Sequence, residues 1–281
     1  CITSVLAVRE FTDEDYLVML TKGGFVKKTA LSAFSNIRTN GLIAISLEEG
    51  DHLKWVRLAR TTDSILIGSH QGMAIHFKAD DDQLRPLGRP TRGVRSMNLR
   101  DGDELISMDI LPSQVVEAVV RANDSDSEEG EEVTPGTEGG PWALVITASG
   151  LGKRVPVSKF RLQNRAGMGL TAIKFRKEDD ALAALLIVHE GDELMLVTNR
   201  GIIIRQRVND ISIQSRPATG VRLQKLDDED AIAAVALVPP ALQDDDDEDG
   251  EDPEGTESLE AEVAAEDAVD TVIDETASEE E

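Results

Sequence analysis

The sequence has a single cysteine and few aromatic residues. Cys1 is the only cysteine among 281 residues, which excludes a disulfide framework and a cysteine-based metal site, and is typical of a reducing cytosol. Aromatic residues make up 3% of the chain, so Val, Ile, Leu and Ala must build the core. No apolar run approaches the roughly 18 residues of a membrane span. We therefore expect no membrane partner.

The start of the chain also lacks features. It has no initiator methionine and no basic segment followed by an apolar core, so we expect no signal peptide. The first residues already form an apolar run, Ile2–Val8. We expect the chain to be a fragment of a longer protein.

Charge of one sign is concentrated in two segments. The net charge is −25, which by itself argues against a nucleic-acid partner. However, residues 241–281 carry 20 acidic residues and no Lys or Arg, and residues 122–140 carry 7 more. The remaining body has 27 acidic and 29 basic residues, a charge of about +2. The acidic total therefore describes two appendages rather than the folded part.

The body repeats with a period near 50 residues. Glycines that follow an apolar run recur at Gly24, Gly72, Gly150 and Gly201, and a second glycine series recurs at Gly41, Gly93, Gly169 and Gly220. The spacings are 48, 78 and 51 residues in the first series and 52, 76 and 51 in the second. The long gap in both series contains the acidic stretch. Two independent markers thus indicate one repeat with an insertion.

Each unit predicts about four short strands bounded by Gly, Asn and Asp turns. In the first unit we expect them at Ile2–Val8, Leu17–Leu20, Phe25–Thr29 and Leu42–Leu47. The expected units are 1–51, 52–103, 104–180 with the insert 122–140, and 181–230, followed by a closing strand in 231–240. Four strands per unit, repeated, predict an all-β, propeller-like fold over residues 1–240.

Basic residues recur at fixed places in this repeat. The predicted DNA-binding residues are Lys27, Lys28, Arg38, Lys78, Arg85, Arg89, Arg92, Arg95, Lys153, Arg154, Arg161, Arg165, Arg205, Arg207 and Arg216; Lys174 and Arg222 follow the second glycines in the same way. If the units are blades, equivalent positions share one rim, and a rim of bases suits the phosphates of bent duplex DNA. The alternative is that these charges only protect strand edges from pairing. The scarcity of aromatics disfavours single-stranded or RNA ligands.

Several segments resemble a known family. Thr21–Thr29, then Arg38–Gly41 and Ile43–Ile45, are similar to the C-terminal domain of the A subunit of bacterial DNA gyrase, as are Thr91–Arg95 and Gly152–Arg154. The resemblance extends through Ile211–Ile213 and Thr219–Val221, and covers roughly residues 1–240. It implies a β-pinwheel, in which outer strands are exchanged between neighbouring blades, with six blades in the family and about four here.

The resemblance also implies a function. In this family the domain wraps double-stranded DNA around its basic rim and supports ATP-dependent negative supercoiling by a type II topoisomerase, which is an isomerase. The enzyme is built from two A and two B subunits. It acts in the bacterial cytoplasm, at the nucleoid. ATP and Mg²⁺ are used through the gyrase B subunit, so we expect no cofactor in this chain. The alternatives are the corresponding domain of topoisomerase IV, a decatenating enzyme, and a propeller-type protein-interaction module. The family's basic Gly-rich heptapeptide, which separates gyrase from topoisomerase IV, has no match here.

Catalytic chemistry is not predicted for the chain itself. The family's catalytic tyrosine lies outside the matched region, and Tyr16 is expected to pack in a strand. The four histidines have no metal-ligand spacing, and Gly152–Lys153 lacks the Ser or Thr of a phosphate-binding loop. We predict no nucleophile–base pair and no metal site.

The acidic tail, residues 241–281, is expected to be disordered because it combines like charge with few aromatics. The sequence pattern of residues 258–272 predicts a transient helix. One interpretation is that the tail only keeps the protein soluble. The other is that the tail, as a tethered polyanion at high local concentration, competes with DNA for basic residues, so that deleting it is expected to tighten DNA binding. The insert 122–140 acts in the same way or is a solvated hairpin loop.

Overall fold

The structure is a computed structural model, and it describes residues 2–115, 117, 140–227 and 229–238. The chain divides into two units, Cys1–Gln243 and Asp244–Glu281. The acidic tail and the insert, including the helical pattern predicted at 258–272, lie outside the described residues. Among the described helices, none is long and apolar enough to cross a bilayer.

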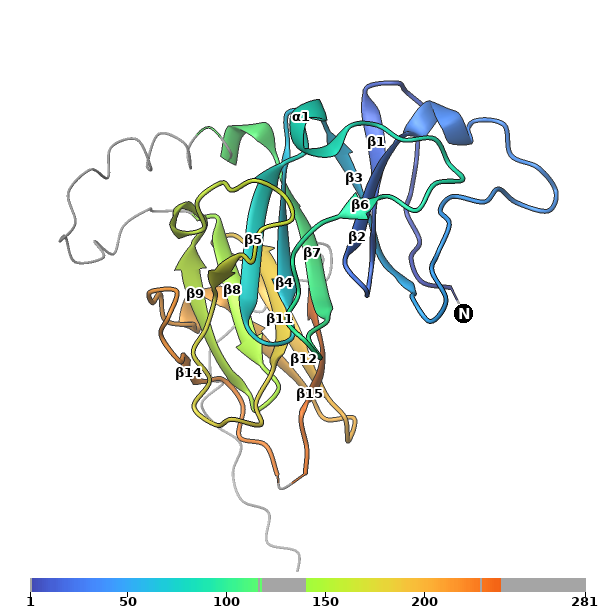
Figure 1. The fold of residues 1–281 in the computed structure, drawn as a ribbon. Coiled ribbons are helices and arrows are strands. Elements are labelled where there is room, and N and C mark those ends of the chain that lie inside the picture. The colour runs from blue at the N-terminus through green and yellow to red at the C-terminus, as the bar shows by residue number, and fades with distance from the viewer. Residues whose placement is uncertain (1, 116, 118–139, 228, 239–281) are drawn as a thin grey trace, which may run out of the picture. The chain divides into compact units, whose positions relative to one another are not determined.

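The described residues of 15–115, 140–227 and 229–238 form antiparallel sheets joined by turns and very short helices (Figure 1). Sheet A has the order β3 (Leu53–Arg60), β1 (Asp15–Thr21), β2 (Phe25–Ala30), β6 (Val94–Arg95). Sheet B has the order β10 (Leu170–Thr171), β5 (Met73–Lys78), β4 (Ser64–Ser69), β7 (Leu105–Leu111). Sheet C has the order β11 (Leu182–Val188), β8 (Trp142–Thr147), β9 (Leu151–Pro156), β14 (Val221–Arg222). Sheet D has the order β13 (Ile203–Arg207), β12 (Glu193–Thr198), β15 (Ile232–Leu237). The short helices are η1 (Leu31–Phe34), α1 (Asp81–Leu84), η2 (Val157–Lys159) and η3 (Val208–Asp210).

Sheets A, B and C each receive their outermost strand from the following unit. Val94 pairs with Val26, Leu170 with Ala74, and Val221 with Gly152. In each pair the first residue directly follows a glycine of the second series. Its partner lies two residues after a glycine of the first series. The identical register confirms the exchanged-strand, propeller-like fold predicted from the sequence.

Those second-series glycines are required by the close approach of two backbones. Gly93 has φ of +100°, and a Cβ there would lie 2.5 Å from the carbonyl oxygen of Val26. Gly220 has φ of +82°, and its Cβ would lie 2.7 Å from the carbonyl oxygen of Gly152. Only glycine permits both the positive φ and the contact. The glycine spacing therefore marks the points where one unit reaches into the next.

An aspartate caps the hairpin turn of each sheet. Asp51 accepts a hydrogen bond from the backbone N–H of Gly23 at 2.8 Å, and Asp103 does the same for Gln71 at 2.9 Å. Asp180 caps Ser149 at 3.1 Å, and Asp230 caps Arg200 at 3.2 Å. The acidic turn that closes every sequence repeat thus satisfies backbone donors of the turn in its own repeat.

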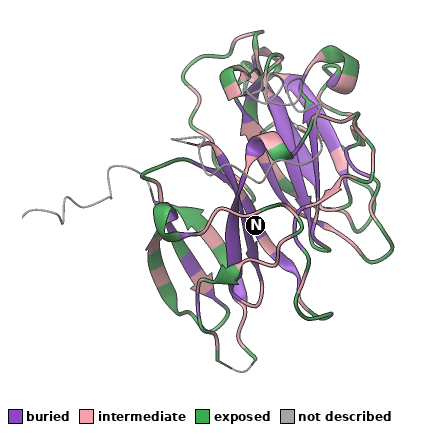
Figure 2. Cartoon of the chain, turned by 90° about the vertical axis from the view of Figure 1, so that its left-hand side faces the viewer, coloured by how far each residue is buried: buried purple, intermediate pink, exposed green. Residues whose placement is uncertain are grey.

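Three apolar clusters join the sheets in chain order. One cluster contains Val18 from sheet A and Ile67 from sheet B, a second contains Leu66 from sheet B and Val145 from sheet C, and a third extends from sheet C into sheet D. Figure 2 shows the buried residues gathered on the strands. The core is almost entirely aliphatic, as the low aromatic content requires, and burial of its side chains stabilises the fold by roughly 25 cal/mol per Å² of apolar surface.

Some strand predictions were wrong. Ile2–Val8 and Leu42–Leu47 form no strand, and Ile2, Val5 and Ile43 are exposed. In the later units the segment equivalent to Leu42–Leu47 pairs with the sheet of the preceding unit, and among the described residues no sheet precedes sheet A. The sheets also divide the chain differently from the expected units: β3 completes sheet A, although its residues were placed in the second unit. The predicted closing strand is β15, which pairs with β12 and completes sheet D.

Candidate nucleic-acid interface

Two predicted contact residues, Lys27 and Lys153, are fully buried. Each lies three residues after its turn glycine, on the strand next to an exchanged strand. Lys153 Nζ donates to the carbonyl oxygens of Ser215 at 2.9 Å and Ala218 at 2.7 Å, and also to that of Arg216. Lys27 Nζ donates to Ala44 O at 2.6 Å, to Thr91 O at 3.3 Å and to Arg89 O. Both ammonium groups therefore hold the loop that leads into the exchanged strand.

The next position holds a contact between units. Lys28 Nζ donates to Ala79 O at 2.6 Å and to Asp81 at 2.9 Å, and it lies 4.7 Å from the Tyr16 ring centre, which confirms that Tyr16 packs in a strand. Arg154 donates to Ile211 O at 2.6 Å and Asn209 O at 3.1 Å. Both side chains reach carbonyl groups at the end of the second hairpin strand of the following unit.

The second unit has His76 at this position. Its Nδ1 lies 2.7 Å from Phe160 O in the following unit, and its Nε2 lies 2.7 Å from Ser64 Oγ. Burial lowers the pKa of His76, with the Phe160 carbonyl acting in the opposite direction. His76 lies on strand β5 and forms the same connection between units as Lys28 and Arg154.

The predicted DNA-binding role of Lys27, Lys28, Lys153 and Arg154 is thereby corrected. Their exposed fractions are 0%, 0%, 0% and 8%, and their donors are directed at protein carbonyls. Burial lowers the pKa of Lys27 to about 8 and that of Lys153 to about 7, with the nearby Arg216 adding to the effect at Lys153. The sequence pattern correctly identified these bases as recurring at regular positions in the repeat. Their role is to stabilise the fold, because the segments that they contact in the following unit place several carbonyl groups near each side chain.

Other predicted residues are partly engaged within the protein. Arg92 forms an ion pair with Glu48 and lies 4.4 Å from the Phe25 ring centre. Arg165 donates to Gln83 O at 2.7 Å, and Arg216 donates to Thr171 O at 2.9 Å. Arg95 lies 5.6 Å from the same Phe25 ring. These side chains are half-buried or exposed and retain further donors, because a guanidinium group has five.

Arg205 and Arg207, on the edge strand of sheet D, share one acidic partner. Arg205 Nε lies 2.5 Å from Glu193, and Arg207 Nε lies 3.6 Å from the same carboxylate. Arg205 occupies the position of Lys28 and Arg154 in its own unit, yet 40% of its side chain is exposed. It is exposed because sheet D has no following unit among the described residues.

The remaining predicted residues have no carboxylate partner among the described residues. Arg38, Lys78, Arg85 and Arg161 are exposed, Arg89 is half-buried, and within the described part of the chain none of their side chains forms an ion pair with a carboxylate. Lys78 and Arg161 line one shallow pocket between sheet B and the loop after η2. They are cations without an internal partner, which is what a phosphate-binding surface requires.

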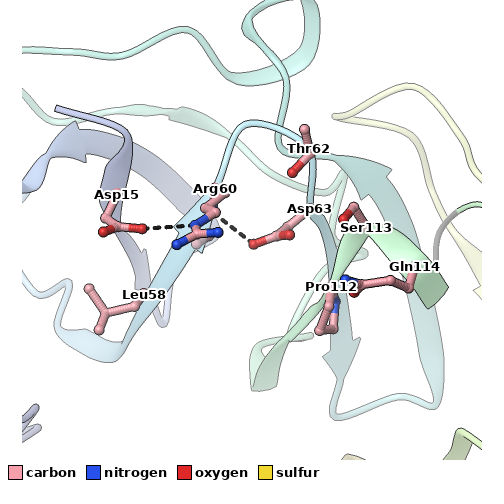
Figure 3. A pocket seen from close by; sticks show the side chains of 9 residues that line it. Asp15, Leu58, Arg60, Thr62, Asp63, Pro112, Ser113 and Gln114 are labelled. Atoms are coloured by element: carbon pink, nitrogen blue, oxygen red, sulfur yellow. Dashed lines mark hydrogen bonds and ion pairs between the residues drawn. The ribbon is translucent and has the colours of Figure 1, made fainter. Parts of the chain in front are cut away.

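The pocket in Figure 3 lies between sheets A and B and offers less to an anion. It has a volume of about 300 Å³. Its one cationic lining residue, Arg60, is held by Asp15 at 3.1 Å, and the Arg60 backbone N–H donates to Asp63 at 2.7 Å. The hydrogen bonds from Thr12 and Arg60 hold the pKa of Asp15 below its usual value. The cation of this pocket is therefore already paired with a carboxylate.

Three basic residues, Arg176, Lys177 and Lys225, were not predicted from the sequence. Together with Arg222 they line one pocket of about 390 Å³ beside the turn of sheet C. The signal was present in the sequence: Arg176 and Lys177 lie seven and eight residues after Gly169, where the first unit has Glu48 and Glu49. Among the described residues no group of three or more His, Cys, Asp or Glu side chains is arranged to hold a metal ion.

A family model described as "DNA gyrase C-terminal domain, beta-propeller" matches four segments of the chain, 15–60, 63–112, 141–189 and 192–239. Each segment contains all the strands of one sheet except the strand that this sheet receives from the following unit.

Relatives agree with the family model. The chain is 64% identical over 248 residues to the DNA gyrase A protein of Synechocystis sp., covering 85% of this chain and 29% of the relative. It is 41% identical to the chloroplastic/mitochondrial DNA gyrase A protein of Arabidopsis thaliana, covering 85% of this chain and 25% of the relative. The chain thus spans less than a third of the length of these relatives.

Two solved structures share the fold. The C-terminal domain of DNA topoisomerase IV superposes with a TM-score of 0.68 at 21% identity, covering 82% of this chain and 64% of that one. The DNA gyrase A C-terminal domain gives 0.63 at 24% identity, covering 81% and 67%. These levels of identity show the fold alone. The family model and the sequence relatives identify the family: the chain belongs to the DNA gyrase C-terminal domain family.

Proposed function

We propose that this chain binds and wraps double-stranded DNA as the C-terminal part of a gyrase A protein. The observation that carries the proposal is the set of exposed cations without an internal acidic partner, on a chain 64% identical to a DNA gyrase A protein. Contacts of this kind require charge and regular spacing rather than base-specific geometry. In the whole protein the wrapped DNA supports ATP-dependent negative supercoiling by a type II topoisomerase of two A and two B subunits, in the cytoplasm at the nucleoid. ATP and Mg²⁺ are used there through the gyrase B subunit.

The identity of 64% favours gyrase over topoisomerase IV, whose C-terminal domain shares only the fold. A protein-interaction module, the remaining alternative, requires no unpaired surface cations and predicts no dependence of duplex binding on salt.

The experiment measures duplex binding by this chain at several salt concentrations. Four exposed bases, Arg38, Lys78, Arg85 and Arg161, are changed together to Ala. If each contacts a phosphate, the slope of log K against log salt becomes shallower by about 3 to 4, at roughly 0.9 per contact. A control variant changes Arg9, Lys54, Arg100 and Arg200, which are also exposed, to Ala. No salt-dependent duplex binding by the unaltered chain would overturn the proposal. Equal losses in both variants would show that the four predicted bases are not preferred contacts.

A further inference from the structure

The turn of sheet C has a basic pocket, whereas the equivalent pocket of sheet A is acidic. It is lined by residues of the β8–β9 turn, by the loop that follows β10, and by residues on and after the exchanged strand β14. Its cationic lining residues are Arg176, Lys177, Arg222 and Lys225, all exposed. Within the described part of the chain, no carboxylate forms an ion pair with any of the four.

The equivalent place in sheet A provides an internal comparison. It is identified by the shared register of Val94 and Val221 and by the shared turn caps, Asp51 and Asp180. At this place Glu48 and Glu49 stand where Arg176 and Lys177 stand in sheet C. Glu48 holds Arg92 in an ion pair, and Lys22 is held by Glu104 at 2.6 Å. The sheet A pocket therefore has two Lys or Arg lining residues, Lys22 and Arg95, against five carboxylates. The described lining of the sheet C pocket has four against three.

Three acidic residues also line the sheet C pocket. Asp230 is already engaged, since its carboxylate accepts the backbone N–H groups of Arg200 at 3.2 Å and Ala231 at 2.9 Å. Asp227 and Glu229 are exposed and form no ion pair with the four cations. The four cations are exposed residues of the pocket lining, and two of them are guanidinium groups, which match a phosphate with two parallel hydrogen bonds.

We propose that this pocket binds a phosphate group of the duplex DNA backbone, and that sheet C is therefore a stronger DNA contact than sheet A. The proposal rests on the proposed function and adds a location to it. Arg222 contributes from the exchanged strand, Lys225 from the segment after it, and Arg176 and Lys177 from the preceding unit. One phosphate site is thus assembled from two repeats.

The test uses charge reversal in this chain, with duplex DNA as the ligand. Arg176→Glu combined with Lys177→Glu is expected to raise the Kd about tenfold or more and to make the salt slope shallower by about 1 to 2. The control, Arg9→Glu with Lys54→Glu, makes the same change in net charge at exposed positions away from the pocket. Lys225→Gln is a milder second variant, expected to weaken binding in the same direction.

The reciprocal variant transfers the basic pair to sheet A. Glu48→Arg with Glu49→Lys is expected to tighten binding, and unchanged or weaker binding counts against the proposal. Circular dichroism checks that each variant is folded. If the unaltered chain binds DNA and the pocket variants match the control, the pocket proposal fails and the proposed function stands. If the unaltered chain does not bind duplex DNA, both fail.

Discussion

The ammonium of Lys153 donates a 2.7 Å hydrogen bond to the carbonyl oxygen of Ala218, two residues before Gly220. Through this contact a buried cation in the third unit anchors the loop that delivers β14 from the fourth unit. Lys27 does the same for the loop before Gly93. A charged residue predicted from its spacing to bind DNA therefore holds the strand exchange together, and the first prediction follows from it.

Lys153→Met is expected to lower the free energy of unfolding by about 1–3 kcal/mol, because it removes the donor from three partly buried hydrogen bonds to carbonyl groups. The measurement is urea denaturation of the variant and the unaltered chain. Lys54→Met, at an exposed position on β3, serves as the control and is expected to change stability by less than about 0.5 kcal/mol. Equal effects of the two substitutions would show that the carbonyl contacts are dispensable.

Stability is expected to depend on pH through Lys153. Burial lowers the pKa of Lys153 to about 7, below the ordinary lysine value of 10.5. Between these two values the unfolded chain binds more protons than the folded chain, so this residue makes the unfolding free energy rise with pH across that window. Lys153→Met removes the contribution, and urea denaturation at about pH 6 and pH 9 should give a smaller rise for the variant. A larger rise in the variant would contradict the assigned direction.

His76 is expected to make the fold sensitive to acid. Its pKa is lowered by burial, so the folded chain holds it neutral while the unfolded chain takes up a proton below about pH 6.5. Stability from this residue is therefore present near neutral pH and lost as the pH falls. Thermal unfolding of His76→Gln should show a weaker dependence between about pH 5 and pH 7 than the unaltered chain. His70, an exposed histidine, is changed to Gln as the control.

Substituting two glycines that have the same φ distinguishes the cost of backbone strain from the cost of a steric clash. Gly220 and Gly201 both have φ of +82°, but a Cβ at Gly220 would lie 2.7 Å from Gly152 O, whereas Gly201 has open space. Gly201→Ala is expected to cost about 1–2 kcal/mol from the left-handed conformation alone. Gly220→Ala should cost more and detach β14, measured by urea denaturation and by hydrogen exchange of the Val221 and Leu223 amides. Similar losses at both positions would mean that the exchanged strand tolerates the shift.

Much of the fold could be predicted because each unit repeats the same local chemistry. Turn glycines, capping aspartates such as Asp51, and short β-branched runs form patterns that can be recognised in the sequence. The strands and turns of each unit can therefore be predicted from the sequence. The segment Leu42–Leu47 has the same pattern as the exchanged strands, yet it forms no strand. A strand needs a partner edge, and whether an edge is present is not a property of the segment itself.

The candidate site was less predictable. Sequence spacing identified Lys153 and Arg161 alike as recurrent bases, but one is buried and the other exposed. The difference depends on whether the following unit brings carbonyl groups to the side chain. Arg176 and Lys177 were missed because their partners Arg222 and Lys225 are distant in the sequence, and only the strand exchange brings the four together.

The sequence by itself determined the repeat, the all-β class, the aliphatic core and the division between a near-neutral body and acidic appendages. These properties follow from composition and from short-range periodicity. Only the tertiary structure decided which cations serve the fold and which remain for a ligand, because burial and hydrogen-bond partners are set by contacts between units. The strand exchange is the physical reason: it places the loop of one repeat over the side chains of another, and so turns identical sequence positions into different chemical environments.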